Sequence, residues 1–233
     1  STSPTNLGLL LLSTLAAYDL GYIGLSDLAA RLRATFDSLT QLEKYRGHFL
    51  NWYDTRTLAP LAPRYVSTVD SGNLVACLRA LGQGCQTLRH QPIWRWKSWE
   101  GLLDTLSLFE VVGRDLSAEA VAPFQATLAH MRQQISAAHD QPETWVPLLN
   151  QLIGQQWREL NHALMALIAA NASALDADAL SQLQLAADRT QHHLYNMQRD
   201  IEQLAPWLKL LIHPPALFTR PDGPPMIQAA WQA

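Results

Sequence analysis

The chain has 233 residues, of which 48% are hydrophobic and only 16% are charged. Charged residues usually make up about a quarter of a soluble domain, so this sequence is apolar for its length and can bury a core as one domain or two small ones. The net charge of −3 provides no basic surface, so neither nucleic acid nor anionic lipid is expected as a partner. Leu-rich periodic segments along most of the chain exclude disorder.

The chain ends and the cysteines indicate what kind of protein this is. The chain starts at Ser1 rather than Met and ends in Pro-rich sequence followed by a short apolar tail, which favours a piece of a longer polypeptide. Cys77 and Cys85 lie in one predicted helix about 12 Å apart, too far for a disulfide. Free, buried thiols are therefore expected, as in a reducing compartment.

The first two helices are predicted from their apolar spacing, and no segment alternates clearly enough to predict a strand. The first, about residues 6–20, begins after the start signal Ser3-Pro4 and is apolar on nearly all sides, which predicts burial on several of them. Its apolar run is too short to span a membrane, so direct membrane insertion of this segment is not expected. The second helix starts at Ser26, with an apolar stripe formed by Leu28, Leu32, Phe36, Leu39 and Leu42.

A long segment without helical spacing follows, residues 46–69, and it is dense in aromatic, Arg and Pro residues. Loops of this length are usually functional or disordered. Asp70 or Ser71 is predicted to cap the third helix, whose apolar stripe is formed by Leu74, Leu78, Leu81, Cys85 and Leu88.

Residues 93–213 are predicted to form a helical bundle with no convergence of polar residues. Helical spacing of apolar residues predicts helices around 99–109, 121–135 and 149–167. The last helix is expected to bend at Pro206. Its stripe alternates three and four residues apart, the seam of an antiparallel bundle or coiled coil: Leu180, Leu183, Ala187, Thr190, Leu194, Met197, Ile201, Leu204 and Leu208.

Residues 45–56, YRGHFLNWYDTR, form the stretch most typical of a binding site. Aromatic faces stack on the C–H faces of sugar rings, while Asn, Asp and Arg bond to neighbouring hydroxyls. The alternative is that Trp52 and Tyr53 fix the loop to the helices while Asp54 and Arg56 form a local turn. Similarly, residues 70–73 (DSGN) are either an ordinary helix cap or part of the same surface. Composition alone leaves both alternatives open.

Two apparent nucleotide motifs and a histidine pair do not predict a cofactor. Asp176 and Asp178 have the spacing of a metal–nucleotide pair, but they lie at a predicted helix start, where acids favour the helix dipole. Residues 91–96 (QPIWRW) approach the Q-x-x-R-W signature of processive transferases with one residue too many. His192 and His193 point about 100° apart on a helix and cannot share a metal. No metal and no other cofactor are therefore expected.

Several motifs together resemble the cyclic β-1,2-glucan synthase family. They occur in the right order within about the first third of the chain, and this sequence departs from the usual pattern at Leu50, where Tyr is expected, and at residues 75–77. The motifs are residues 2–9 (TSPTNLGL), 45–49 (YRGHF), 51–58 (NWYDTRTL) and 63–74 (PRYVSTVDSGNL).

This resemblance implies a large enzyme of the bacterial inner membrane. Such an enzyme has a glycosyltransferase domain that uses UDP-glucose, a middle glycoamylase-like α/α-barrel domain and a C-terminal phosphorylase-like domain. The matched motifs belong to the start of the middle domain, which is associated with the transglycosylation that closes the glucan ring. The resemblance also implies that the catalytic carboxylates lie beyond this chain, which would be inactive alone, and that the chain lies on the cytoplasmic side of the membrane.

The expected fold is all-α, with partial α/α-barrel hairpins packed with an antiparallel helical bundle. Residues 1–92 would be the N-terminal part of the glycoamylase-like domain with its aromatic loop at 46–69, residues 93–213 the bundle, and residues 214–233 an irregular tail. A six-hairpin barrel needs more helices than the first block supplies. The first three helices are therefore expected to leave apolar surface for the rest of the polypeptide to cover.

The expected partners are a β-1,2-glucan and the remaining domains of the same polypeptide. An alternative hypothesis is a helical scaffold that spaces the domains or associates with a second copy through the stripe of the last helix. On the first hypothesis, the residues expected to contact glucan are Trp52, Tyr53, Asp54, Arg56, Arg64, Tyr65, Asp70 and Asn73.

Overall fold

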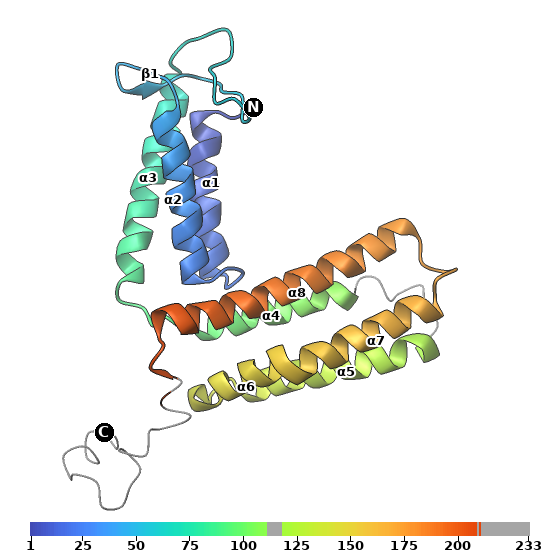
Figure 1. Cartoon of the computed structure of the whole chain (residues 1–233). Coiled ribbons are helices and arrows are strands. Elements are labelled where there is room, and N and C mark those ends of the chain that lie inside the picture. Colours follow the sequence, from blue (N-terminus) through green and yellow to red (C-terminus); the bar gives the residue numbers. More distant parts are fainter. Residues whose placement is uncertain (111–117, 209, 211–233) are drawn as a thin grey trace, which may run out of the picture. The chain divides into compact units, whose positions relative to one another are not determined.

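Figure 1 presents a computed structural model of the chain, which describes residues 1–110, 118–208 and 210. The prediction of an all-α fold is confirmed, since among these residues helices predominate and the only sheet has two short strands. Two compact units divide the chain, Ser1–Leu102 and Leu103–Ala233. The predicted boundary at residue 92 and the barrel-type hairpin packing stay predictions, and the predicted tail at 214–233 lies outside the described residues.

The first unit contains three helices that lie side by side, α1 (Pro4–Asp19), α2 (Leu25–Gln41) and α3 (Thr68–Leu88) (Figure 1). The predicted start of α1 is confirmed, because Ser3 Oγ accepts a hydrogen bond from Asn6 N at 3.3 Å and Pro4 is the first helical residue. Prolines favour that position because its N–H has no partner within the helix.

One side of α1 is not buried, although its apolar composition predicted burial on several sides. Leu11 and Leu15 lie in the core, whereas Leu9 is 54% exposed and Leu10 is 48% exposed. Some apolar surface of α1 is therefore exposed.

Helices α1 and α3 run parallel and approach closely through two glycines. A Cβ atom added to Gly8 of α1 would lie 2.9 Å from Cys77 Sγ of α3, and one added to Gly84 of α3 would lie 2.4 Å from Leu15 Cδ2 of α1. The two contacts are one heptad apart on each helix and occur in the same order. Glycines here allow the helix backbones to approach more closely than larger residues would permit.

A tight turn joins α1 to α2 at Gly21. Gly21 has φ +82°, and a Cβ atom there would lie 1.8 Å from the carbonyl oxygen of Lys97. Close by, Arg95 donates a hydrogen bond to Tyr18 O at 3.1 Å and covers the Tyr18 ring at 4.2 Å. Only glycine fits this backbone conformation and this approach.

A short hairpin, β1 (Lys44–Tyr45) and β2 (His48–Phe49), lies where the sequence predicted no strand. Its two-residue turn, Arg46-Gly47, has φ +51° and +84°. Positive φ at both central residues is the type I′ conformation, whose twist matches that of the flanking strands. The strands are too short for apolar alternation to reveal them.

Helix α3 begins earlier than predicted. Its cap is Ser67, whose Oγ accepts a hydrogen bond from Asp70 N at 3.2 Å, so the prediction that Asp70 or Ser71 caps the helix is wrong. A Ser three residues before an acidic residue is a common helix start, and here the Ser is the cap. Cys77 and Cys85 both lie in α3 and are free thiols, as predicted, but the prediction that both are buried is wrong for Cys85, which is only partly buried.

The described residues of the second unit form helices joined by short turns, with no strand among them, and the unit boundary falls within α4 (Trp96–Ser107). After α5 (Ala118–Ala137) come α6 (Trp145–Gln151), a π-helical turn at Leu152–Gln156 and α7 (Trp157–Ala170). The predicted helix around 149–167 is therefore interrupted by a π turn. Such turns insert one extra residue and shift the side chains that follow.

The last helix, α8 (Ala177–Leu204), starts as expected and ends earlier. Asp176 caps it by accepting a hydrogen bond from Ala179 N at 2.7 Å, which agrees with an acid at a helix start rather than a nucleotide motif. The helix does not continue unbroken to Leu208 as predicted: it is interrupted at residues 205–207, around Pro206, and Leu208 is again helical. Proline disfavours helical backbone in the residue before it, and Ala205 leaves the helical region with ψ 51°.

The stripe of α8 is largely buried, and polar residues beside it are buried too, although the sequence predicted no convergence of polar residues in this bundle. Leu183, Leu194 and Ile201 are all at most 5% exposed. His193 is also buried, and its Nδ1 lies 3.4 Å from Thr105 Oγ1 of α4. No described helix is long and apolar enough to cross a membrane.

Candidate functional site

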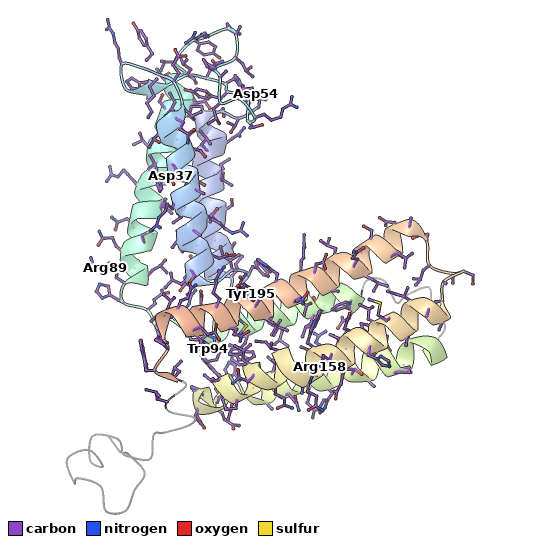
Figure 2. All side chains as sticks on the ribbon, viewed as in Figure 1. Asp37, Asp54, Arg89, Trp94, Arg158 and Tyr195 are labelled. Atoms are coloured by element: carbon purple, nitrogen blue, oxygen red, sulfur yellow. The ribbon has the colours of Figure 1, made fainter. Side chains whose placement is uncertain are left out.

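The aromatic loop between β2 and α3 lies at one end of the first unit, where Figure 2 labels Asp54. Backbone hydrogen bonds fix its path: Thr2 and Tyr53 each donate to the other's carbonyl oxygen at 2.9 Å, and Leu61 N donates to Trp52 O at 2.9 Å. Tyr53 also bridges to Pro60, so the N-terminus and two arms of the loop lie side by side. The loop is therefore ordered by its own backbone.

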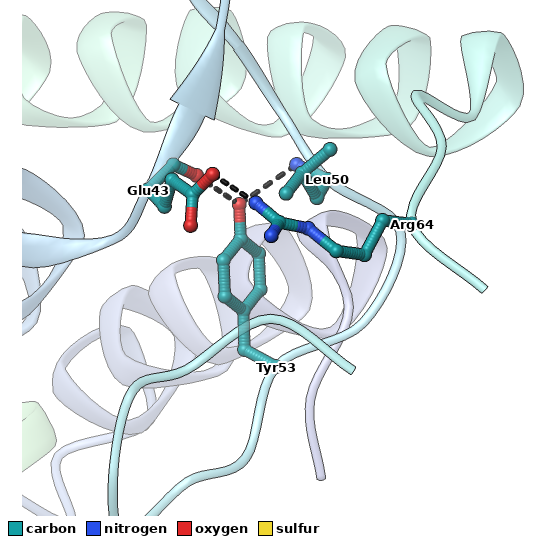
Figure 3. A network of polar contacts seen from close by, with 4 residues as sticks. All are labelled: Glu43, Leu50, Tyr53 and Arg64. Atoms are coloured by element: carbon teal, nitrogen blue, oxygen red, sulfur yellow. Dashed lines mark hydrogen bonds and ion pairs between the residues drawn. The ribbon is translucent and has the colours of Figure 1, made fainter. Parts of the chain in front are cut away.

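Tyr53 is the anchor of this loop. Its side chain is fully buried, and its hydroxyl donates to Glu43 O at 2.6 Å and accepts from Leu50 N at 2.7 Å (Figure 3). Burial raises the pKa of the Tyr53 hydroxyl, which stays protonated and able to donate. A ring in this position packs against the core and offers no face to a ligand.

Arg64 lies beside the same network and pairs with the carboxylate of Glu43 (Figure 3). Both side chains are about half exposed, at 52% and 53%. Exposed pairs contribute little to stability because water and salt screen them. The guanidinium of Arg64 thus remains accessible at the surface.

Asp54 forms a local turn, which is the structural alternative raised by the sequence. Its Oδ1 accepts hydrogen bonds from Arg56 N at 2.8 Å and Thr57 N at 3.0 Å. These backbone N–H groups lower the pKa of Asp54 by stabilising the carboxylate. The turn projects the Arg56 side chain into solvent.

Asp70 and Asn73 lie where the first turns of α1 and α3 meet. Thr5 Oγ1 donates to Asp70 Oδ1 at 2.6 Å, and Asn73 Nδ2 donates to Thr5 Oγ1 at 3.1 Å. Hydrogen bonds from Thr5 and then Ser67 lower the pKa of Asp70. An anion beside two helix N-termini is favoured by both helix dipoles, so this cluster joins the helices.

Trp52 and Tyr65 are the large aromatic side chains of the loop that remain exposed, at 41% and 52%. Asn51 N donates to Tyr65 O at 2.9 Å, which brings their two segments together. Tyr45, on the hairpin, is 57% exposed and lies under the Arg46 guanidinium at 5.4 Å. It belongs to the predicted 45–56 stretch but was not among the eight residues expected to contact glucan. The Arg46-Gly47 sequence is typical of a tight turn, and it could have predicted that Tyr45 lies at an exposed hairpin.

The arrangement offers aromatic faces and guanidinium donors to a polar ligand. Among residues 1–110, 118–208 and 210, no group of three or more His, Cys, Asp or Glu side chains is placed to hold a metal ion. The eight predicted residues thus fall into two sets. Tyr53, Asp54, Asp70 and Asn73 are hydrogen-bonded within the chain. Asn73 is also exposed, and the remaining exposed residues are Trp52, Arg56, Arg64 and Tyr65, of which Arg64 pairs with Glu43. These four are called the exposed set.

No protein-family model matches this chain. A stretch of 91 residues is 47% identical to the cyclic β-(1,2)-glucan synthase NdvB of Rhizobium meliloti (strain 1021). That stretch covers 39% of the chain and 3% of the length of the synthase. The chain is therefore related to a cyclic glucan synthase over part of its length, in agreement with the resemblance of its motifs.

Proposed function

We propose that this chain is a segment of a cyclic β-1,2-glucan synthase and that its aromatic loop contributes to glucan binding in the domain that closes the ring. The observation that carries the proposal is the 47% identity to NdvB over 91 residues. The remaining domains of the same polypeptide would be its partners, and the assembled enzyme would lie at the cytoplasmic side of the inner membrane.

The exposed set of loop residues would make the contacts. Trp52 and Tyr65 would stack on glucose rings, while Arg56 and Arg64 would donate hydrogen bonds to hydroxyls. The hydrogen-bonded set would act indirectly, with Tyr53, whose ring is buried, fixing the loop. Preorganisation of this kind favours binding because little loop entropy is lost.

A titration of the full chain with linear β-1,2-glucooligosaccharides tests these contacts. The Trp52 indole resonance, assigned through Trp52→Phe, is expected to shift saturably. Tyr65→Ala should weaken that binding about tenfold, the loss expected for one stacked ring. The matched control is Tyr195→Ala, because Tyr195 is similarly exposed, at 59%, on α8. No saccharide response at Trp52, or an equal effect of both substitutions, would refute the assignment.

If this proposal is correct, the chain alone would have no catalytic activity. The catalytic carboxylates would be supplied by the rest of the enzyme, so incubation with linear β-1,2-glucan should give neither cyclic nor shortened products. Chromatographic detection of either product would show that the chain is itself an enzyme.

The alternative function is a helical scaffold that spaces the domains. The length of α8, 28 residues, favours a spacing role. Self-association through its stripe is less favoured, because Leu183 and Leu194 are already buried. Sedimentation of the full chain separates the two versions, since a monomer at all concentrations excludes self-association.

A further inference from the structure

A surface groove on the second unit has no role in the proposed loop site. It lies between α7 and α8, two consecutive antiparallel helices (Figure 1), and has a volume of about 460 Å³. Sites for small ligands commonly measure about 300–1,000 Å³. The groove is therefore large enough for a few sugar rings or a molecule of similar size.

The floor and the rim of the groove differ in chemistry. Leu164 is 2% exposed and forms part of an apolar floor, and the indole of half-buried Trp157 contributes to the lining. The rim carries exposed polar side chains from both helices: Asn161, Gln184, Asp188 and Gln191. An apolar surface with a few convergent polar groups is typical of a binding site.

Two amides near the groove are paired within the chain, whereas among the described residues the amides of the rim are not. Outside the groove, Gln155 donates to Glu159 at 2.8 Å and Gln182 donates to Asp178 at 2.8 Å, each four residues apart. Gln184 and Asp188 have the same spacing, yet no hydrogen bond joins them among the described residues.

The whole rim shares this property. Within the described part of the chain, none of the side chains of Asn161, Gln184, Asp188 and Gln191 makes a hydrogen bond or ion pair. Their donors and acceptors are therefore available, at an apolar surface, to a ligand. Carboxamides both donate and accept, which is what a row of hydroxyls requires.

We propose that the α7/α8 groove binds a neutral saccharide, with Trp157 as the aromatic wall and the rim amides as hydrogen-bond partners. The single carboxylate, Asp188, disfavours anionic ligands such as phosphates, and the absence of further charge among the groove residues gives no basis for a polycation. A second saccharide site would let each unit of the chain bind glucan. The choice of glucan as the probe rests on the proposed function.

The test is an NMR titration of the full ¹⁵N-labelled chain with linear β-1,2-glucooligosaccharides. The Trp157 indole resonance, assigned through Trp157→Phe, should shift saturably. Gln184→Ala and Gln191→Ala should each raise Kd about 2- to 10-fold, the change expected for one hydrogen bond. Both glutamines are exposed, so these two variants should fold even if a substitution of the half-buried Trp157 destabilises the chain.

Two controls make the result specific. Gln182→Ala removes an exposed amide outside the groove, paired with Asp178, and should leave Kd unchanged. Trp207→Phe changes another indole, 54% exposed, and should also leave it unchanged. The proposal is overturned if the Trp157 resonance does not respond to saccharide, if it responds only to an amphipathic helical peptide, or if the rim variants behave like Gln182→Ala.

The same titration separates this inference from the loop proposal. A response at Trp157 without one at Trp52 would support the groove and refute the loop contacts. A response at Trp52 alone would do the reverse, because each indole reports on its own unit.

Discussion

The aromatic loop of the first unit and the α7/α8 groove of the second contain similar residue types that are used differently. In the loop, Tyr53 and Asp54 bond to the chain's own backbone. In the groove, Gln184 and Asp188 make no side-chain hydrogen bond to the described residues. Polar residues that hold a fold together and polar residues available for binding are thus distinguished by their partners, not by their identity.

The largest expected effect concerns Tyr53. Tyr53→Ala should lower the free energy of unfolding by about 3–5 kcal/mol, because it leaves a cavity in the core. Tyr53→Phe keeps the ring but leaves Glu43 O and Leu50 N without their hydroxyl partner, which should cost about 1–3 kcal/mol. Urea denaturation followed at the Trp52 indole measures both. Tyr65→Phe serves as the control because Tyr65 is exposed. An equal loss of unfolding free energy in Tyr65→Phe would show that the Tyr53 hydroxyl has no special structural role.

The next effect concerns backbone conformation in the first unit. Gly21→Ala should destabilise it by at least about 2 kcal/mol, because the new methyl would meet the Lys97 carbonyl at a positive φ. Gly82→Ala is the matched control: nothing lies within 4 Å of its Cβ position, in the middle of α3. That variant should gain about 0.5–1 kcal/mol from helix propensity. Thermal unfolding should therefore give shifts of opposite sign.

A smaller effect concerns the pH dependence of stability. Because the folded pKa of Asp70 lies below its ordinary value, its carboxylate stabilises the fold above about pH 4, and this contribution is lost as pH falls through the folded pKa. Asp70→Asn should cost about 1 kcal/mol at neutral pH, allowing for partial exposure. Denaturation at successively lower pH should show the variant and the original chain converging. If the difference in unfolding free energy between the two chains stayed constant with pH, the charge of Asp70 would not be the cause of the stabilisation.

The smallest effects concern exposed side chains in both regions. Arg64→Ala and Gln184→Ala should each change stability by less than about 0.5 kcal/mol, because one breaks an exposed pair and the other breaks no bond. Both should weaken saccharide binding in the titrations described above. A large stability loss in Gln184→Ala would show that the amide has a structural role.

Local signals in the sequence predicted much of the fold. Ser3-Pro4 predicted the start of α1 and Asp176 the start of α8, because caps depend on only a few neighbouring residues. The Arg46-Gly47 turn was missed because its strands are too short to show a period. Its positive φ at a bulky Arg is also uncommon.

The candidate site was harder to predict because its roles depend on distant residues. Nothing local distinguishes Trp52 from Tyr53, yet one is exposed and the other is held by Thr2 and Glu43. The groove was not predicted either. The sequence predicted only a helix around 149–167 within a bundle, and the open space beside Leu164 depends on the arrangement of α7 against α8.

The close approach of α1 and α3 gives the two cysteines of α3 different access to reagents, so their reactivity can report on the opening of the first unit. Cys77 is buried with its Sγ against Gly8, whereas Cys85, two turns along the same helix, is only half-buried. Alkylating reagents should therefore modify Cys85 first and reach Cys77 only when α1 separates from α3. The ratio of the two labelling rates would measure how often the first unit opens, without any label being introduced.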